Sequence, residues 1–197
     1  MSRFFPRAEF AEDQPLAKTI LTSHVLHRGF QSGALVGAMV AAVRSVSVKS
    51  SSRTVTDSQQ QALKATAVLQ TPAAASAGHV PGVSLKPSLQ SRLITGAARG
   101  SLIGTAVFAV ALVGRMNGRE DIEWKDRSWR LQANEGQLET DDWSVTGAAV
   151  GAVGANFVKT FGTIAPWQRV VGGAGLGGLA GVAGYMAYRY GMHGGKR

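Results

Sequence analysis

Four histidines are the side chains of this sequence best suited to hold a metal ion, but only two are spaced to act together. His24 and His27 would share one face of a helix, whereas His79 and His193 lie far from them in the sequence. A zinc site needs at least three protein ligands, and the sequence places neither a cysteine nor a carboxylate beside this pair. We therefore predict no metal site and assign the two histidines to a surface or an interface.

Three cations interrupt stretches that are otherwise apolar, where an ionisable group is a functional candidate by default. They are Arg44, Arg99 and Lys159. Because no acidic residue lies in the same stretches, a proton relay is not expected. We predict instead that these cations reach lipid headgroups or pair with a partner subunit. The aromatic candidates for lipid or partner contact are Trp124, Trp129, Trp143 and Trp167.

Serine, histidine and acidic residues are present, but their spacing matches no catalytic or nucleotide-binding motif. The glycine-rich run GAGLGG at 173–178 lies inside an apolar segment rather than after a strand, which excludes a phosphate-binding loop. We predict no catalytic residues, no cofactor and no small-molecule substrate.

Charge is distributed unevenly along the chain. The net charge is +9, but the 21 Lys and Arg residues are scattered and flank apolar segments, so nucleic acid is not the expected partner. Eight of the 12 acidic residues lie between Glu120 and Asp142. This acidic cluster is either an ordinary solvated loop, since nearby basic residues partly neutralise it, or a docking site anchored by Trp124 and Trp129.

Four apolar stretches of about 20 residues match the roughly 30 Å thickness of a bilayer's hydrocarbon core. They are residues 29–48, 93–114, 144–165 and 170–188, and none contains an acidic residue. Trp143 and Trp167 bracket the third stretch, and Pro166 begins a tight turn into the fourth. We predict an all-α membrane protein with four transmembrane helices.

Small residues recur at every fourth position in all four stretches, which places them on one face of each helix. In lipid, such faces let helix backbones approach closely, as in the GxxxG motif. We predict glycine-zipper packing of the four helices through Gly33, Gly37, Gly96, Gly100, Gly104, Gly147, Gly151, Gly173, Gly177 and Gly181.

The remaining segments complete the expected organisation. Residues 1–28 form an N-terminal arm, 29–190 the membrane domain and 191–197 a basic tail. The loop 49–91 is expected to be mostly extended, with one short helix near 57–69. The loop 115–143 is expected to carry a surface helix near 119–133.

Several of these segments together resemble the mitochondrial inner-membrane translocase superfamily. They are SGALVGAMVAAV, GAARGSLIGTAVFAVALVGR, the loop that ends in DDW, and GGAGLGGLAG, and the resemblance covers about residues 29–190. This superfamily contains channel subunits of protein translocases and a four-span accessory subunit of respiratory complex I. Translocase members use acidic residues in their membrane cavity and some have a disulfide. This chain has no acid in any span and no cysteine.

The resemblance therefore implies a non-catalytic accessory subunit of NADH:ubiquinone oxidoreductase (complex I), which stabilises or assembles its membrane arm. Its partners would be other membrane subunits and lipids. The resemblance also implies the mitochondrial inner membrane, with both termini in the intermembrane space. Charge alone does not decide the orientation, because residues 49–92 and 115–143, the two long connections between predicted spans, each contain five Lys and Arg residues. The alternatives are a translocase subunit, a fungal-type complex I subunit only loosely similar to the superfamily, and a soluble glycine-rich helical protein.

Overall fold

The computed structural model describes residues 5–66, 88–158 and 164–192, with only the backbone described for 47–66. Within these residues the chain is helical and has no strand. The elements are η2 (Ala11–Asp13), α1 (Ala17–Thr66), α2 (Leu89–Met116), α3 (Asp121–Ala133), α4 (Glu135–Gly154), α5 (Pro166–Met186) and η4 (Ala187–Met192). Three helical segments are long and apolar enough to cross a membrane: Ala17–Val46, Leu89–Met116 and Pro166–Met192.

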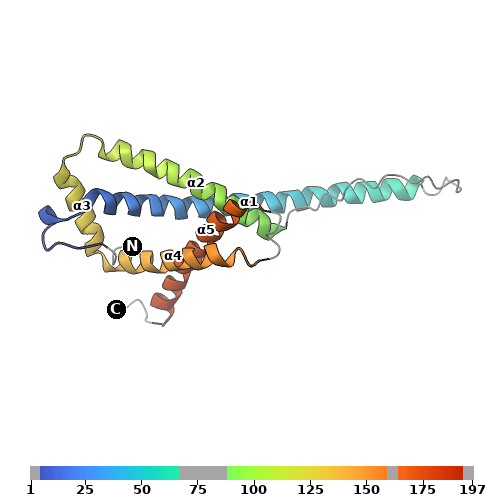
Figure 1. Cartoon of the computed structure of the whole chain (residues 1–197). Coiled ribbons are helices and arrows are strands. Elements are labelled where there is room, and N and C mark those ends of the chain that lie inside the picture. The colour runs from blue at the N-terminus through green and yellow to red at the C-terminus, as the bar shows by residue number, and fades with distance from the viewer. Residues whose placement is uncertain (1–4, 67–87, 159–163, 193–197) are drawn as a thin grey trace.

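The long helices form two antiparallel pairs. α1 lies along α2, α4 packs against α5, and α3 closes one end of the molecule (Figure 1). The helix backbones approach each other at glycines. A Cβ atom added to Gly33 would come closer than 3.0 Å to the backbone of Gly100, and one added to Gly147 would do the same at Gly177. Side chains at these positions would force the helices apart.

α5 connects the two pairs because glycines lie on two of its faces. Gly173 and Gly177 face α4, whereas Gly172 faces the backbone of Ile94 in α2. A Cβ on Gly175 would lie 2.7 Å from the Cβ of Ala34 in α1 and 2.9 Å from Oγ of Ser101 in α2. Ile94, Ala34 and Ser101 are all fully buried, so this crossing is the core of the fold.

Local sequence explains where the helices begin and end. The Ser88 hydroxyl accepts a hydrogen bond from the Ser91 amide at the start of α2, and Asn134 caps α4 in the same way through the Gln137 amide. α2 stops before Gly118, which has a φ of 71° that favours glycine. Pro166 occupies the first turn of α5, where its missing amide hydrogen is not needed.

The first helix differs from its predicted limits at both ends. It begins at Ala17 rather than 29, so half of the predicted N-terminal arm is helical. It continues to Thr66, so the extended loop predicted from residue 49 and the separate helix near 57–69 are wrong up to that residue. No Gly or Pro occurs from Ala38 to Thr71, so no residue breaks the helix there. The remaining part of the predicted loop, 67–87, lies outside the described residues.

The third predicted stretch, 144–165, is not one continuous helix. α4 begins earlier, at the Asn134 cap, and ends at Gly154, where the side-chain amide of Asn156 donates to the carbonyl oxygen of Ala152 at 2.9 Å. This side-chain hydrogen bond competes with a further helical turn. Trp143 and Trp167 therefore do not mark the two ends of one helix, and α4 is not among the three long apolar helices.

The other two predictions about helices agree better with the structure. α3 occupies the place of the surface helix predicted near 119–133. α5 starts four residues before the predicted 170, and the helical path continues through η4 to Met192, into the predicted tail. Residues 193–197 lie outside the described part of the chain.

Candidate functional site

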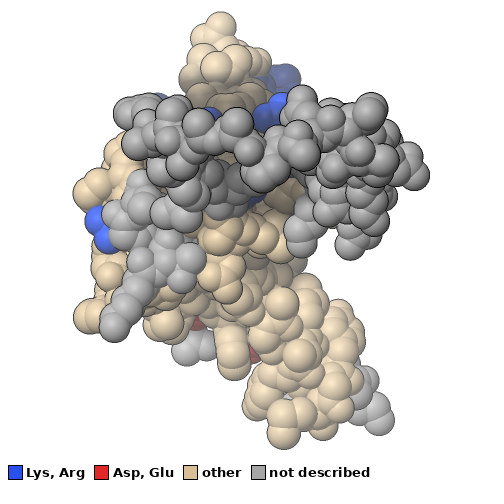
Figure 2. All heavy atoms as spheres, turned by 90° about the vertical axis from the view of Figure 1, so that its right-hand side faces the viewer, with Lys and Arg blue, Asp and Glu red and all other residues tan. Residues whose placement is uncertain are grey.

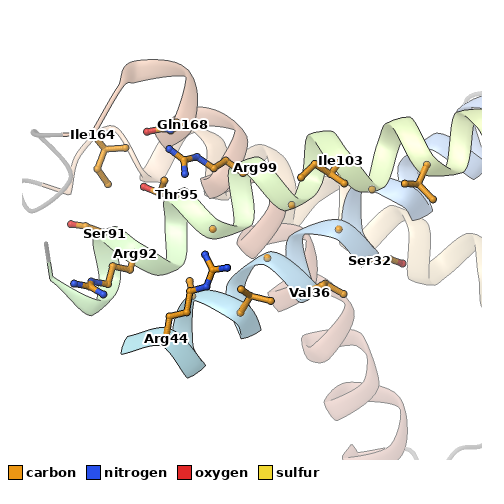
Figure 3. Close-up of a pocket in the computed structure, with 18 of the residues that line it drawn as sticks. Ser32, Val36, Arg44, Ser91, Arg92, Thr95, Arg99, Ile103, Ile164 and Gln168 are labelled. Atoms are coloured by element: carbon orange, nitrogen blue, oxygen red, sulfur yellow. The ribbon is translucent and has the colours of Figure 1, made fainter. Parts of the chain in front are cut away.

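A groove with a volume of about 750 Å³ runs along the α1–α2 pair (Figure 3). Its floor is formed by the glycines at which the two helices meet. Its walls are apolar, with Val36 and Val40 on α1 and Ile103 and Val107 on α2. The volume falls in the range of roughly 300–1,000 Å³ that is typical of ligand sites.

Three arginines gather toward one end of this groove. Arg44 comes from α1, and Arg92 and Arg99 come from α2 (Figure 3). Arg44 and Arg99 are exposed, and neither has an ion-pair partner within the described part of the chain. Ser91, Thr95 and Gln168 add polar groups to the same end of the groove. The groove is therefore amphipathic along its length, with a cationic end and an apolar remainder.

The α4–α5 pair carries a second hollow of about 510 Å³ with the opposite charge. Glu139, Asp142 and Trp143 line it together with glycines of both helices. The Tyr185 hydroxyl donates to Oε2 of Glu139 at 2.8 Å, and the ring of Tyr188 stacks on Trp143 at 5.9 Å between centroids. The carboxylate of Glu139 already accepts a hydrogen bond within the chain, so it is less available to a ligand than the arginines of the α1–α2 groove (here called the arginine groove).

A buried polar cluster joins α1 to α4. The carboxylate of Asp141, whose side chain is only 2% exposed, accepts a hydrogen bond from Nδ1 of His24 at 2.9 Å and forms an ion pair with Arg28 at 2.7 Å. Nε2 of His24 lies 3.2 Å from the side-chain amide of Gln137, which holds the ring in place. Burial alone would raise the pKa of Asp141, but the hydrogen bond from His24 and the charge of Arg28 together bring it below its ordinary value.

A second set of hydrogen bonds continues this cluster along α1. Nε2 of His27 lies 2.7 Å from the Ser144 hydroxyl and 3.0 Å from the side-chain amide of Gln31. The oxygen of that amide accepts from Arg28 at 3.1 Å. Ser144 is fully buried. Oδ1 of Asp141 has the ion pair with Arg28 but no hydrogen bond, and the other contacts of the cluster fix the position of α4 relative to α1.

The chain before α1 is held on α3 by backbone acceptors. The indole nitrogen of Trp129 donates to the carbonyl oxygen of Ala8 at 3.1 Å, and the ammonium of Lys125 donates to that of Glu12 at 2.8 Å. The guanidinium of Arg7 lies 5.6 Å from the centre of the Trp129 ring. Trp129 thus contacts this chain's own N-terminal segment, while Trp124 is half-buried on the same helix.

The structure brings together residues that the sequence left apart. The expectation that His24 has no carboxylate nearby is wrong, because Asp141 contacts it from a helix 117 residues away. A detectable signal was present: His24, His27, Arg28 and Gln31 follow the spacing of one helix face, and such a polar stripe in an apolar helix needs polar partners.

The predicted packing glycines lie opposite one another between paired helices. Gly33 faces Gly100, Gly37 faces Gly96, Gly147 faces Gly177 and Gly151 faces Gly173. Gly104 lies against Gly29 and Gly33, and Gly181 lies against the backbone of Trp143. Of the predicted contact residues, Arg44 and Arg99 line the arginine groove, and Trp143 and Trp167 are partly exposed. Lys159 lies outside the described residues.

Within the part of the chain that the structure describes, these features define an all-helical protein with three helices able to cross a membrane. The chain belongs to the DUF1757 family, described as a protein of unknown function, whose model matches residues 4–165. α5 and η4 follow the matched region. No curated protein and no solved structure matches the chain significantly.

Proposed function

We propose that the protein is a non-catalytic accessory subunit of mitochondrial complex I that stabilises or assembles its membrane arm. The observation that carries this proposal is the apolar outer surface of the long helices. Val110 is 73% exposed on α2, and Val43 is 65% exposed on α1. Apolar surface of this kind on a soluble monomer would be unusual, whereas lipid tails and neighbouring membrane subunits would cover it.

In this proposal α4 and the residues that follow it provide a fourth span, so that four helices form one glycine-packed bundle. The part of α4 after Trp143 is too short to cross the bilayer alone, at roughly 17 Å. Support comes from the close approach of Gly147 and Gly151 in α4 to Gly177 and Gly173 in α5. Because α4 packs this closely along α5, which is long enough to span a membrane, we place α4 in the same membrane domain.

The proposed location is the mitochondrial inner membrane, with both termini in the intermembrane space. The contacts of Asp141 with His24 and of Glu139 with Tyr185 support a common side for the termini. They bring the start of α1, the start of α4 and the end of α5 together. α3, which carries three acidic and three basic residues, lies at this same end (Figure 1). From the opposite end, Lys and Arg are visible at more places than Asp and Glu (Figure 2).

The assignment to complex I, rather than to a translocase, rests on the resemblance in sequence and on the charge of the α1–α2 groove. A path for basic presequences needs acidic side chains, and the described groove is lined by Arg44, Arg92 and Arg99 instead. These arginines would repel such a substrate.

A native gel of mitochondrial membranes in mild detergent, followed by mass spectrometry, tests the proposal. We expect the protein to migrate with NADH dehydrogenase activity and to remain in the membrane after carbonate extraction. Migration with translocase components would replace the assignment with the translocase alternative. Release by carbonate would leave only the soluble alternative.

A further inference from the structure

We infer that the α1–α2 groove binds one anionic phospholipid, with its phosphate on the arginines and one acyl chain along the glycine floor. This inference rests on the membrane location in the proposed function and adds a specific ligand to it. The groove combines arginines that can bind the phosphate with apolar walls that can contact the acyl chain (Figure 3).

The cationic end of the groove has the groups that recognise a phosphate. Guanidinium groups form paired, charge-assisted hydrogen bonds with phosphate oxygens. Arg44 and Arg99 have no ion-pair partner in the described chain, so binding a phosphate would not require them to leave another carboxylate. Thr95 lies at the same end and offers a hydroxyl donor to the remaining phosphate or ester oxygens.

The position of Arg99 also favours a bound anion. It lies two to three turns inside α2, where a lone cation in hydrocarbon disfavours insertion of the helix. Among the residues that the structure describes, no acidic side chain lines the groove to neutralise it. An anionic headgroup drawn down to the arginines would supply the missing negative charge, as basic pockets between membrane helices do for anionic lipids generally.

The rest of the groove fits an acyl chain rather than a polar ligand. Its walls beyond the arginines are Val36 and Val40 on one side and Ile103 and Val107 on the other. Glycines keep its floor free of side chains, so a chain would contact helix backbone directly. From Arg92 to Phe108 the groove follows roughly 24 Å of helix, and an acyl chain in one leaflet needs about 15 Å.

The first experiment is native mass spectrometry of the full chain in mild detergent, titrated with phosphatidylglycerol or phosphatidylcholine that carry the same acyl chains. We expect one phosphatidylglycerol to bind at least about tenfold more tightly than phosphatidylcholine, because only the anionic headgroup leaves the arginine charges neutralised. Equal affinities for the two lipids would overturn the inference, and this comparison requires no variant.

Two pairs of variants locate the lipid. Replacing Arg44, Arg92 and Arg99 by Gln should remove the preference for phosphatidylglycerol. The matched control replaces Arg119, which precedes α3, and Arg127 and Arg130 on α3 by Gln. This removes the same charge away from the groove and should retain the preference. If both triple variants lose the preference equally, the lipid responds to net charge alone and the inference fails.

A second pair of variants tests whether the acyl chain lies in the groove. Val40→Trp fills the groove and should lower the affinity for phosphatidylglycerol at least about tenfold. Val110→Trp, at an exposed site on α2 outside the groove, should not. Unchanged affinity in Val40→Trp would exclude this groove. Failure of the membrane location, on which this inference rests, is distinguishable from these outcomes, because it would appear as a chain that remains folded and monodisperse in buffer without detergent.

Discussion

The carboxylate of Asp141 and the imidazole of His24 lie 2.9 Å apart in the interior, although 117 residues separate them in the chain. Arg28 contacts the same carboxylate from one turn further along α1. These contacts connect the two helix pairs at the end that α3 closes. The interface between the two helix pairs is therefore polar at this end. Where α5 crosses α1 and α2, small residues form the same interface.

Replacing Asp141 by Ala should reduce the free energy of unfolding by about 3 kcal/mol, since it removes the buried carboxylate that both His24 and the partly buried Arg28 contact. Urea unfolding in mild detergent, followed by circular dichroism, would measure the change. The control is Asp126→Ala, because Asp126 pairs with Arg130 on the exposed surface of α3 and such pairs contribute under about 1 kcal/mol. Similar losses in both variants would contradict a special role for the buried cluster.

Periodicity along single helices predicted more of this fold than it could predict of the contacts between them. The helical class follows from the spacing of apolar and small residues within each segment. That these contacts form one four-span bundle in a bilayer stays a prediction. The Asp141–His24 pair could not be predicted, because no local pattern specifies which helices become neighbours.

The limits of the first and third segments were wrong for a related reason. Hydropathy marks where a chain can enter lipid, whereas helices end where backbone hydrogen bonding fails. α1 therefore continues to Thr66 through polar residues without a breaker. α4 ends at Gly154, inside an apolar stretch, where the amide of Asn156 takes a carbonyl oxygen.

Acid should weaken the fold through Asp141. Its pKa in the folded protein lies below the ordinary value of 3.8, so its carboxylate stabilises the fold fully above that value. The stabilisation should disappear as the pH falls below 3.8 and through the folded-state pKa. Unfolding curves measured between pH 6 and pH 2.5 should show that the free energy of unfolding decreases with falling pH. This decrease should be smaller in Asp141→Asn than in the wild type.

Asp121 provides the control for this pH dependence. A hydrogen bond from Lys18 also lowers the pKa of Asp121, but both side chains are exposed and solvent screens the pair. Asp121→Asn should therefore retain most of the acid response of the wild type. An acid response that disappears in Asp121→Asn and persists in Asp141→Asn would reverse the assignment.

Gly100→Ala and Gly114→Ala should change stability in opposite directions although both lie on α2. A methyl group at Gly100 would overlap the carbonyl oxygen of Gly33, and overpacking of this kind destabilises by about 1–3 kcal/mol. Nothing lies within 4 Å of a Cβ at Gly114, so Ala there gains helix propensity of up to about 1 kcal/mol. Unfolding in detergent measures both, and equal effects would show that α1 and α2 are not in contact there.

Trp129→Phe should loosen the segment before α1, because an aromatic side chain is kept while the hydrogen bond from the indole nitrogen to the carbonyl oxygen of Ala8 is lost. One such bond contributes about 1 kcal/mol, which corresponds to an increase of about fivefold in the open population. Trypsin cleavage after Arg7, followed by mass spectrometry, would report this increase. Trp124→Phe on the same helix should leave the cleavage rate unchanged; faster cleavage in both variants would point to a general loosening of α3.

The α4–α5 pair can be tested by a disulfide, because the chain has no cysteine of its own. A Cβ on Gly178 would lie 3.6 Å from the Cβ of Ala148, which suits a disulfide. We expect the double variant Ala148→Cys/Gly178→Cys to cross-link nearly completely under mild oxidation. Ala148→Cys/Gly184→Cys should not, since Gly184 lies almost two turns further along α5 and faces the Trp143 ring.

Adding Gly151→Ala to the cross-linking pair should then lower the yield, because its methyl group would overlap the carbonyl oxygen of Gly173 and push the helices apart. Gly154→Ala lies on the same helix with nothing within 4 Å of its Cβ and should leave the yield unchanged. The two substitutions add the same methyl group three residues apart, so a difference between them reports the contact face alone. If both leave the yield unchanged, α4 approaches α5 through other residues, and the glycines of α4 lose their proposed role in packing.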